Sequence, residues 1–153
     1  MYERILVPFD GSPTSKKGLQ EAMHLGKALG SRLRVLHVVE NPVMLDFTGM
    51  ANIGDVLDVL RRTGQELLAS AQALARQQGI DADTALVEER LERVADVVIR
   101  HAREWSADLI VMGTHGRRGV SHLLLGSDAE GVIRLSPVPV LLVRLQEQAD
   151  SVP

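Results

Sequence analysis

Residues Leu109-Ile110-Val111-Met112 form an unbroken apolar run, and Gly113-Thr114-His115-Gly116 follow it directly. A short run without polar positions predicts a parallel strand that helices cover on both faces of its sheet. The glycines after the run let the backbone turn sharply and let a ligand approach the main chain closely. This stretch therefore predicts a buried strand that ends in a loop suited to binding.

Strand-like and helix-like segments alternate through the rest of the chain. We expect strands at 5–9, 33–39, 82–87, 108–112 and 138–145, and helices at 19–29, 56–75, 91–105 and from 127 onward. The alternation predicts an α/β fold: a single open parallel five-stranded sheet with helices on both faces and right-handed crossovers. Residues 1–146 are expected to form this one domain, and residues 147–153 a polar C-terminal tail.

Two of the expected strands have features of sheet edges. Residues 82–87 have no strongly apolar face, and Pro139 lies in the last strand, where it cannot donate to a ladder of hydrogen bonds. Residues 40–52 are polar and contain glycine, so they are expected to form a loop. In such sheets ligands bind beyond the carboxyl ends of the strands, where the winding direction reverses. That rule points to the segments after the first and fourth strands, which contain Asp10-Gly11-Ser12 and Gly113–Gly116.

Composition excludes several classes of protein. The chain has 153 residues, a net charge of −3, 3% aromatic residues and no cysteine. These values argue against nucleic-acid binding, disulfide scaffolds and thiolate metal sites. No apolar run approaches the roughly 18 residues that span a bilayer, so we expect a cytoplasmic protein without a membrane span. The lysines lie outside any Walker spacing, and no G-x-S-x-G elbow occurs.

The glycine-rich segment allows two interpretations. Helix N-termini attract phosphate, so the Gly113–Gly116 bend and the helix start at Ser127 could together cradle an anion. Alternatively, Ser127-Asp128-Ala129-Glu130 is a capping box that satisfies the helix's own amides, and the glycines only form a loop. For His115 and His122 a structural role is favoured over metal ligation, and no metal site formed by protein ligands is expected.

The spacing Gly113-x2-Gly116-x9-Gly126-Ser127 resembles the nucleotide-binding signature of the universal stress protein family. Further blocks that are similar to the family lie in the same order at 4–12, 37–39, 107–116 and 136–143, so the resemblance covers nearly the whole chain. It implies a Rossmann-like sheet of the adenine nucleotide alpha-hydrolase type with strand order 3-2-1-4-5. It also implies bound ATP, or ADP or AMP, with Mg²⁺.

The resemblance implies a role for each residue of the site. Adenine would lie near Pro8 and Val38, and Asp10 would accept from ribose hydroxyls or lie near the metal. Met112 and Gly113 would flank the ribose. The remaining expected nucleotide contacts lie in or after the glycine loop: His115, Gly116, Arg117, Gly126, Ser127 and Asp128. Arg117 and Arg118 would screen phosphates or form a solvated loop tip.

Two features depart from the expected pattern. Asp128 and Glu130 place two carboxylates in the first turn of the phosphate-binding helix, where they would repel a triphosphate unless they face outward or Mg²⁺ intervenes. After the third strand the chain runs Glu88-Glu89-Arg90 into the next helix, where many family members have a glycine-containing turn. This second departure could alter the rim of the pocket.

Three functions remain open from the sequence. The first is an ATP-binding regulatory module of the stress response with little or no turnover, acting on an unidentified protein partner. The second is a slow Mg²⁺-dependent ATPase, or a nucleotidyl or phosphoryl transferase, that uses Asp10. The third is a nucleotide-free dimeric module. Residues 138–143 form an apolar edge with few charges, which predicts a homodimer through this strand unless the C-terminal tail covers it.

Overall fold

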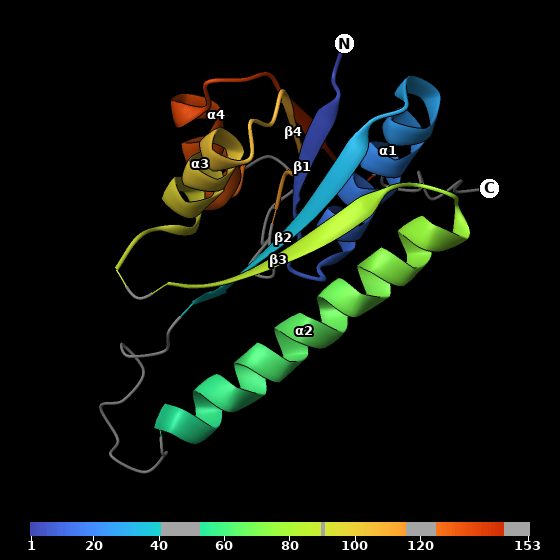
Figure 1. Cartoon of the computed structure of the whole chain (residues 1–153). Coiled ribbons are helices and arrows are strands. Elements are labelled where there is room, and N and C mark those ends of the chain that lie inside the picture. Colours follow the sequence, from blue (N-terminus) through green and yellow to red (C-terminus); the bar gives the residue numbers. More distant parts are fainter. Residues whose placement is uncertain (41–52, 90, 116–124, 146–153) are drawn as a thin grey trace, which may run out of the picture.

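The computed structural model describes residues 1–40, 53–89, 91–115 and 125–145, and in these ranges it is an α/β fold. Five parallel strands lie in the order β3-β2-β1-β4-β5, and Figure 1 labels the first four of them. The strands are β1 (Arg4–Pro8), β2 (Arg32–Glu40), β3 (Ala82–Glu89), β4 (Leu109–Gly113) and β5 (Val140–Val143). The helices are α1 (Pro13–Leu29), α2 (Ile53–Gln77), α3 (Val94–Glu104) and α4 (Ser127–Leu135). The predicted fold class and strand order are confirmed.

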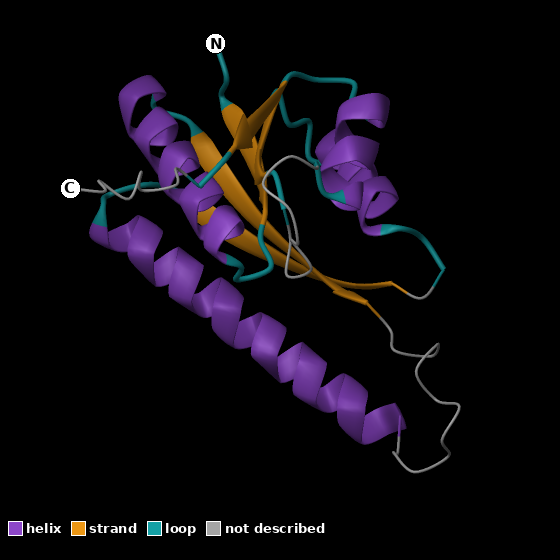
Figure 2. Cartoon of the chain, turned by 180° about the vertical axis from the view of Figure 1, so that it is seen from behind, coloured by secondary structure: helices purple, strands orange, loops and turns teal. Residues whose placement is uncertain are grey.

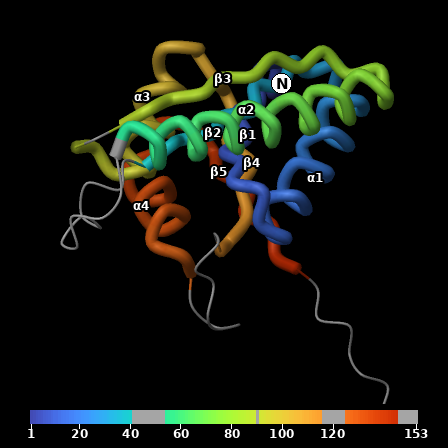
Figure 3. Tube along the Cα trace, turned by 90° about the horizontal axis from the view of Figure 1, so that it is seen from below, coloured from blue at the N-terminus to red at the C-terminus, as the bar shows by residue number. Residues whose placement is uncertain are grey.

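Helices cover both faces of the sheet. Helices α1 and α2 lie on one face, and α3 and α4 lie together on the other (Figure 2). Each face has its own apolar core, one centred on Ile5, Val7, Met23 and Val35, the other on Leu6, Leu36, Val98 and Ile110. Consecutive residues of β1 alternate between these cores, because side chains of a strand point to opposite faces in turn. The view from below shows the strands between α1 and α4 (Figure 3).

The winding direction reverses between β1 and β4. The first three strands step outward from β1 to β3, and the chain then returns to place β4 on the other side of β1. Strand β1 pairs with β2 from Arg4↔Arg32 to Pro8↔Leu36, and with β4 at Ile5↔Leu109 and Leu6↔Ile110. The carboxyl ends of β1, β2 and β4 therefore share one edge of the sheet, where ligands bind in folds of this kind.

Ion pairs hold the edge strand β3, whose residues are almost all half-buried. Arg34 on β2 makes two hydrogen bonds to Asp83 on β3, at 2.6 and 2.9 Å, and lies 4.8 Å above the Trp105 ring. The Asp83 contact raises the pKa of Arg34, and hydrogen bonds to Glu88 likewise raise the pKa of Arg61 on α2. The edge positions expected for β3 and β5 are both confirmed.

Several predicted boundaries are wrong. Helix α1 begins at Pro13 rather than Leu19, because Ser12 is already its N-cap. Helix α3 begins at Val94 rather than Leu91, and Leu91 is 96% exposed because it lies in the preceding turn, where its N–H donates to Glu89 Oε1. Strand β5 is shorter than predicted, since only Val140–Val143 pair with β4. The expected loop at 40–52 and the tail at 147–153 lie almost wholly outside the described residues. No helix of the described part is long and apolar enough to cross a membrane.

Gly113 lies where the start of α1 packs closely against β4. A Cβ atom at this position would lie 2.7 Å from the carbonyl carbon of Thr14 and 2.9 Å from the amide nitrogen of Ser15. Both contacts are with the backbone of the first turn of α1, which cannot rotate away as a side chain can. The end of β4 and the start of α1 therefore approach each other only because residue 113 has no side chain.

We expect Gly113→Ala to lower the free energy of unfolding by about 1–3 kcal/mol, because the new methyl group must displace the first turn of α1. Urea unfolding followed by circular dichroism measures this difference. The matched control is Gly54→Ala on the exposed first turn of α2, where alanine should be neutral or slightly stabilising. Equal stability of the two variants would show that the contact at Gly113 is not tight.

Candidate functional site

Three of the predicted nucleotide contacts share one face and one edge of the sheet. Val38 and Met112 pack in the core under α3 and α4, at the carboxyl ends of β2 and β4. Pro8 lies two residues after Leu6, which belongs to the same core, so strand alternation places it on that face as well. Pro8 and Val38 are half-buried, and Met112 is buried. The residues expected around the base and the ribose thus come together from neighbouring strands.

The bend after β1 is built around Asp10. Its Oδ1 accepts from the N–H of Ser12 at 2.9 Å, which closes a turn, and Gly11 adopts φ +79°, a conformation that favours glycine. Ser12 caps α1, because its Oγ accepts from the N–H of Ser15 at 3.2 Å. Asp10 is half-buried and lies just beyond the carboxyl end of β1, as predicted.

The bend after β4 meets the start of α4. The N–H of Gly126 donates to the carbonyl of Thr114 at 2.8 Å, and the N–H of Thr114 donates to the carbonyl of Val143 at 3.0 Å. The hydroxyl of Thr14 on α1 donates to the carbonyl of His115. The segment Thr114–His115 is therefore fixed by β5, α4 and α1 together, and the two glycine-containing ends of the predicted loop lie side by side.

The capping-box interpretation of Ser127-Asp128-Ala129-Glu130 is wrong. The residue at the N-cap of α4 is Gly126, with φ −61° and ψ 151°, and it has no side chain with which to cap the helix. Ser127 is instead the first helical residue and is exposed. Glu130 is exposed and pairs with Arg134 at 2.9 Å rather than with the helix's first amides. Asp128 is exposed too.

His37 is a residue near the site to which the sequence analysis gave no role. Its Nδ1 lies 2.8 Å from the carbonyl of Phe9, so it links the end of β2 to the bend after β1. Its ring packs under Gly64 of α2, where a Cβ would lie 2.6 Å from His37 Cδ2. A histidine within the apolar run Leu36–Val39 was the available signal. It positions the backbone next to Val38 and Asp10.

Part of the predicted site cannot be placed. Gly116 and Arg117, together with Arg118 and His122, lie outside the described residues. Within the ranges that the structure describes, no group of three or more histidine, aspartate or glutamate side chains could hold a metal ion.

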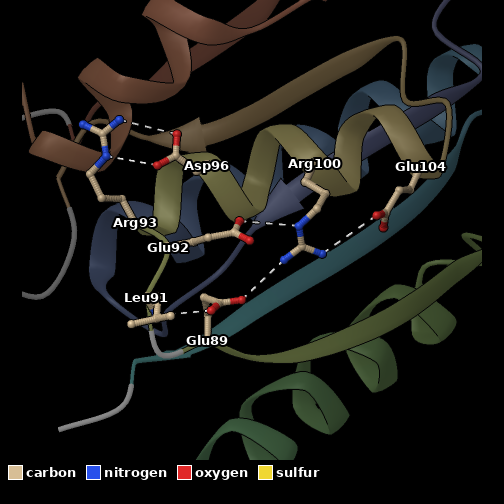
Figure 4. Close-up of polar contacts among 7 residues, drawn as sticks. All are labelled: Glu89, Leu91, Glu92, Arg93, Asp96, Arg100 and Glu104. Carbon is tan, nitrogen blue, oxygen red and sulfur yellow. Dashed lines mark hydrogen bonds and ion pairs between the residues drawn. The ribbon is translucent and has the colours of Figure 1, made fainter. Parts of the chain in front are cut away.

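Arg100 organises the turn between β3 and α3 at the rim of this edge (Figure 4). Its guanidinium lies 3.6 Å from a carboxylate oxygen of Glu89, 3.5 Å from one of Glu92 and 3.9 Å from one of Glu104. Arg93 pairs separately with Asp96 at 3.0 Å. Within the described residues, Glu88 and Glu89 at the end of β3 thus lead into a turn in which Arg100 contacts three carboxylates.

Comparison with known proteins gives one family across the chain. The Universal stress protein family matches residues 1–144. A curated universal stress protein of Methanocaldococcus jannaschii is 34% identical over 148 residues, which cover 94% of this chain and 83% of that protein. A universal stress protein of Thermus aquaticus is 36% identical over 144 residues, which cover 94% of this chain and 100% of that protein.

Solved structures agree with the sequence comparison. The crystal structure of a universal stress protein family member from Burkholderia pseudomallei has a TM-score of 0.77 and 34% identity, and covers 93% of this chain and 96% of that chain. Two further universal stress protein structures, at 24% and 23% identity and a TM-score of 0.66 each, are complexes with cAMP and, for the protein from Archaeoglobus fulgidus, with dAMP. The cAMP complex covers 94% of this chain and 97% of its own chain. The dAMP complex covers 93% of this chain and 98% of its own chain. At this identity the two complexes bear on the fold of the present chain.

We expect Arg100→Met to lower the free energy of unfolding by up to about 1 kcal/mol at low salt, and less at high salt. The substitution leaves three carboxylates close together without their shared cation. Urea unfolding at two salt concentrations measures the effect. The control is Arg103→Met, since Arg103 is exposed on the same helix. If the loss of unfolding free energy grew with salt concentration, or equalled the loss in Arg103→Met, this result would contradict the role given to Arg100.

Proposed function

The chain belongs to the universal stress protein family, and from this membership we propose that it binds an adenine nucleotide at the carboxyl ends of β1 and β4. We further propose that the ligand is ATP with Mg²⁺, that ADP or AMP enters the same base pocket, and that binding regulates a protein partner with little or no turnover. Relatives crystallised with cAMP and dAMP support an adenine nucleotide as the ligand class.

One observation carries the proposal: the hydrogen bond from Gly126 N–H to the Thr114 carbonyl. It brings the glycine segment after β4 against the N-terminus of α4, where the N-cap residue is Gly126 and carries no side chain. The backbone amides at such a helix start carry a partial positive charge and can donate to phosphate oxygens. The pairing of Glu130 with Arg134 keeps its carboxylate away from this end of the helix.

Each residue type suits its part of the nucleotide. Pro8 and Val38 offer apolar surface to the base from two neighbouring strands. Met112 lies near the end of β4, and Asp10 follows β1. The thioether of Met112 can pack on the ribose, and the carboxylate of Asp10 can accept hydrogen bonds from the ribose hydroxyls. Ser127 and the amide of Asp128 face the phosphates, while Gly126, whose own N–H bonds to Thr114, contributes by leaving room for them.

A binding role fits Asp10 better than a catalytic one. One of its carboxylate oxygens already accepts from Ser12 N–H, so its position serves the turn. A general base would need to reach the attacking water or hydroxyl without losing that contact. We therefore favour a regulatory module over the alternative, a slow Mg²⁺-dependent ATPase or transferase that uses Asp10. The proposal places the protein in the cytoplasm.

We also propose a homodimer through β5, the strand predicted from residues 138–143. It is the edge strand next to β4, and Leu141 on it is 40% exposed. Leu145 after it is 49% exposed, and Ile133 and Leu135 on α4 are 45% and 40% exposed. An unpaired apolar edge favours pairing with a second copy.

We expect the purified protein to release an adenine nucleotide on denaturation, identified by mass. ATP at 100 times its dissociation constant should raise the free energy of unfolding by about 2.7 kcal/mol. Gly126→Val should abolish this stabilisation, because its side chain occupies the space proposed for phosphate while φ −61° remains allowed.

The matched control is Arg93→Val, which puts valine at the N-cap of α3 with φ −70° and ψ 152°. It should retain ATP binding. Failure of the wild-type chain to bind any adenine nucleotide would overturn the proposal and leave the nucleotide-free dimeric module. Steady release of ADP or AMP with Mg·ATP, lost in Asp10→Asn, would favour the enzyme.

We expect sedimentation velocity to give a dimer at micromolar concentration, and Leu141→Arg to give a monomer, because it buries a charge at the proposed interface. Val59→Arg is the control, since Val59 is 59% exposed on α2, away from β5. A wild-type monomer, or a dimer that Leu141→Arg leaves intact, would contradict pairing through this strand.

A further inference from the structure

Helix α2 buries residues only from its middle onward. From Gly54 to Thr63 none of its residues is buried, and the buried positions that follow are Gly64, Leu68, Ala71 and Ala75. Their spacing places them on one helix face, which packs on the core beside β2 and β3. The turn from Gly64 to Leu68 is therefore where α2 first enters the fold.

This turn of α2 contacts the bend after β1 directly. A Cβ atom at Gly11 would lie 2.7 Å from Cδ2 and 3.3 Å from Cδ1 of Leu67, so the two residues are in close contact. Leu67 also packs against the core that contains Phe9, the last residue before the bend. Because the end of the Leu67 side chain fills the space beside Gly11, the residue after Asp10 rests on α2.

The same turn reaches the residue before Asp10 through the ring of His37. A Cβ atom at Gly64 would lie 2.6 Å from Cδ2 of this ring. Nδ1 of the ring lies 2.8 Å from the carbonyl oxygen of Phe9, which can only accept, so Nδ1 carries the hydrogen and donates it. His37 is 7% exposed, and a ring enclosed in this way has few other orientations.

Both neighbours of Asp10 are thus tied to one turn of α2. The carboxylate of Asp10 depends on the same stretch of backbone, because its Oδ1 accepts from the N–H of Ser12. A densely packed interior transmits a shift of one element to its neighbours. A movement of α2 toward or away from the sheet would therefore change the direction in which the Asp10 carboxylate points.

We propose that α2 controls the ribose end of the site: through Leu67 and His37 it holds the bend in the arrangement in which Asp10 accepts from the ribose hydroxyls. The inference rests on the proposed nucleotide binding and adds a regulatory element to it. Leu67 and His37 are positioning residues that act through Asp10. By linkage, a bound ribose must in turn stabilise the packing of α2 on the bend.

Calorimetric titration of the full chain with Mg²⁺ and either ATP or 2′,3′-dideoxy-ATP, which lacks both ribose hydroxyls, tests the positioning. The wild-type chain should bind ATP about 10- to 100-fold more tightly, because hydrogen bonds to a carboxylate are strong. Leu67→Ala should reduce this preference at least about threefold and leave the affinity for dideoxy-ATP unchanged. The matched control is Leu74→Ala, which should keep the full preference, since Leu74 is 37% exposed further along α2.

A second pair of variants tests the path through the imidazole. His37→Leu should reduce the preference for ATP, and His37→Asn, which keeps an N–H donor for the Phe9 carbonyl, should recover it. A merely structural role would instead lower the affinities for ATP and dideoxy-ATP equally. Such an equal loss in Leu67→Ala or His37→Leu, or equal affinities of the wild-type chain for the two nucleotides, would overturn the inference alone.

Hydrogen exchange of the wild-type chain tests the coupling in the reverse direction. At equal saturation, ATP should slow the exchange of the α2 amides from Arg61 to Leu68 more than dideoxy-ATP does, whereas the two nucleotides should affect α3 alike. Equal protection of α2 by both nucleotides would contradict the coupling. Failure of the wild-type chain to bind either nucleotide would overturn the proposed function, and the control by α2 would fall with it.

Discussion

The close approach of β4 to the first turn of α1 is the constraint on which the rest of the site depends. Gly113 has no room for a side chain, because the backbone of Thr14 and Ser15 fills that space. This contact sets where β4 ends, and the next two residues then bond to β5, α4 and α1. The edge of the sheet is consequently shaped by backbone packing before any ligand enters it.

Glycine spacing therefore carries two meanings in this chain. From the sequence, Gly113 was expected to leave room for a nucleotide. The packing of α1 against β4 also requires that residue 113 has no side chain. Gly64 has a similar structural reason, since it makes room for the His37 ring. A glycine that follows a strand shows that something approaches the backbone closely, and only the fold shows whether this is a helix or a ligand.

Apolar periodicity predicted the parallel sheet and its two edges, because burial on both faces leaves a plain pattern in β1 and β4, whereas the strand order came from the family resemblance. It could not predict the ion pair between Arg34 and Asp83, which depends on the register of β2 and β3. Nor could it predict the start of α4. Ser127 and Glu130 have the residue types of a capping box, yet the bond between Gly126 and Thr114 makes Gly126 the N-cap. Local propensity was overruled there by a contact twelve residues away in the chain.

The two edges of the sheet differ in charge. The outer strand β3 carries Asp83, which Arg32 and Arg34 contact, and Glu88, which Arg61 contacts. The strand β5 at the opposite edge is apolar over Val140–Val143. Solvated charges on one border hinder the addition of a further strand there. If two copies paired through β5, only their charged β3 edges would stay open. No third copy would add a strand there, so association would end at the dimer and would not continue into fibres.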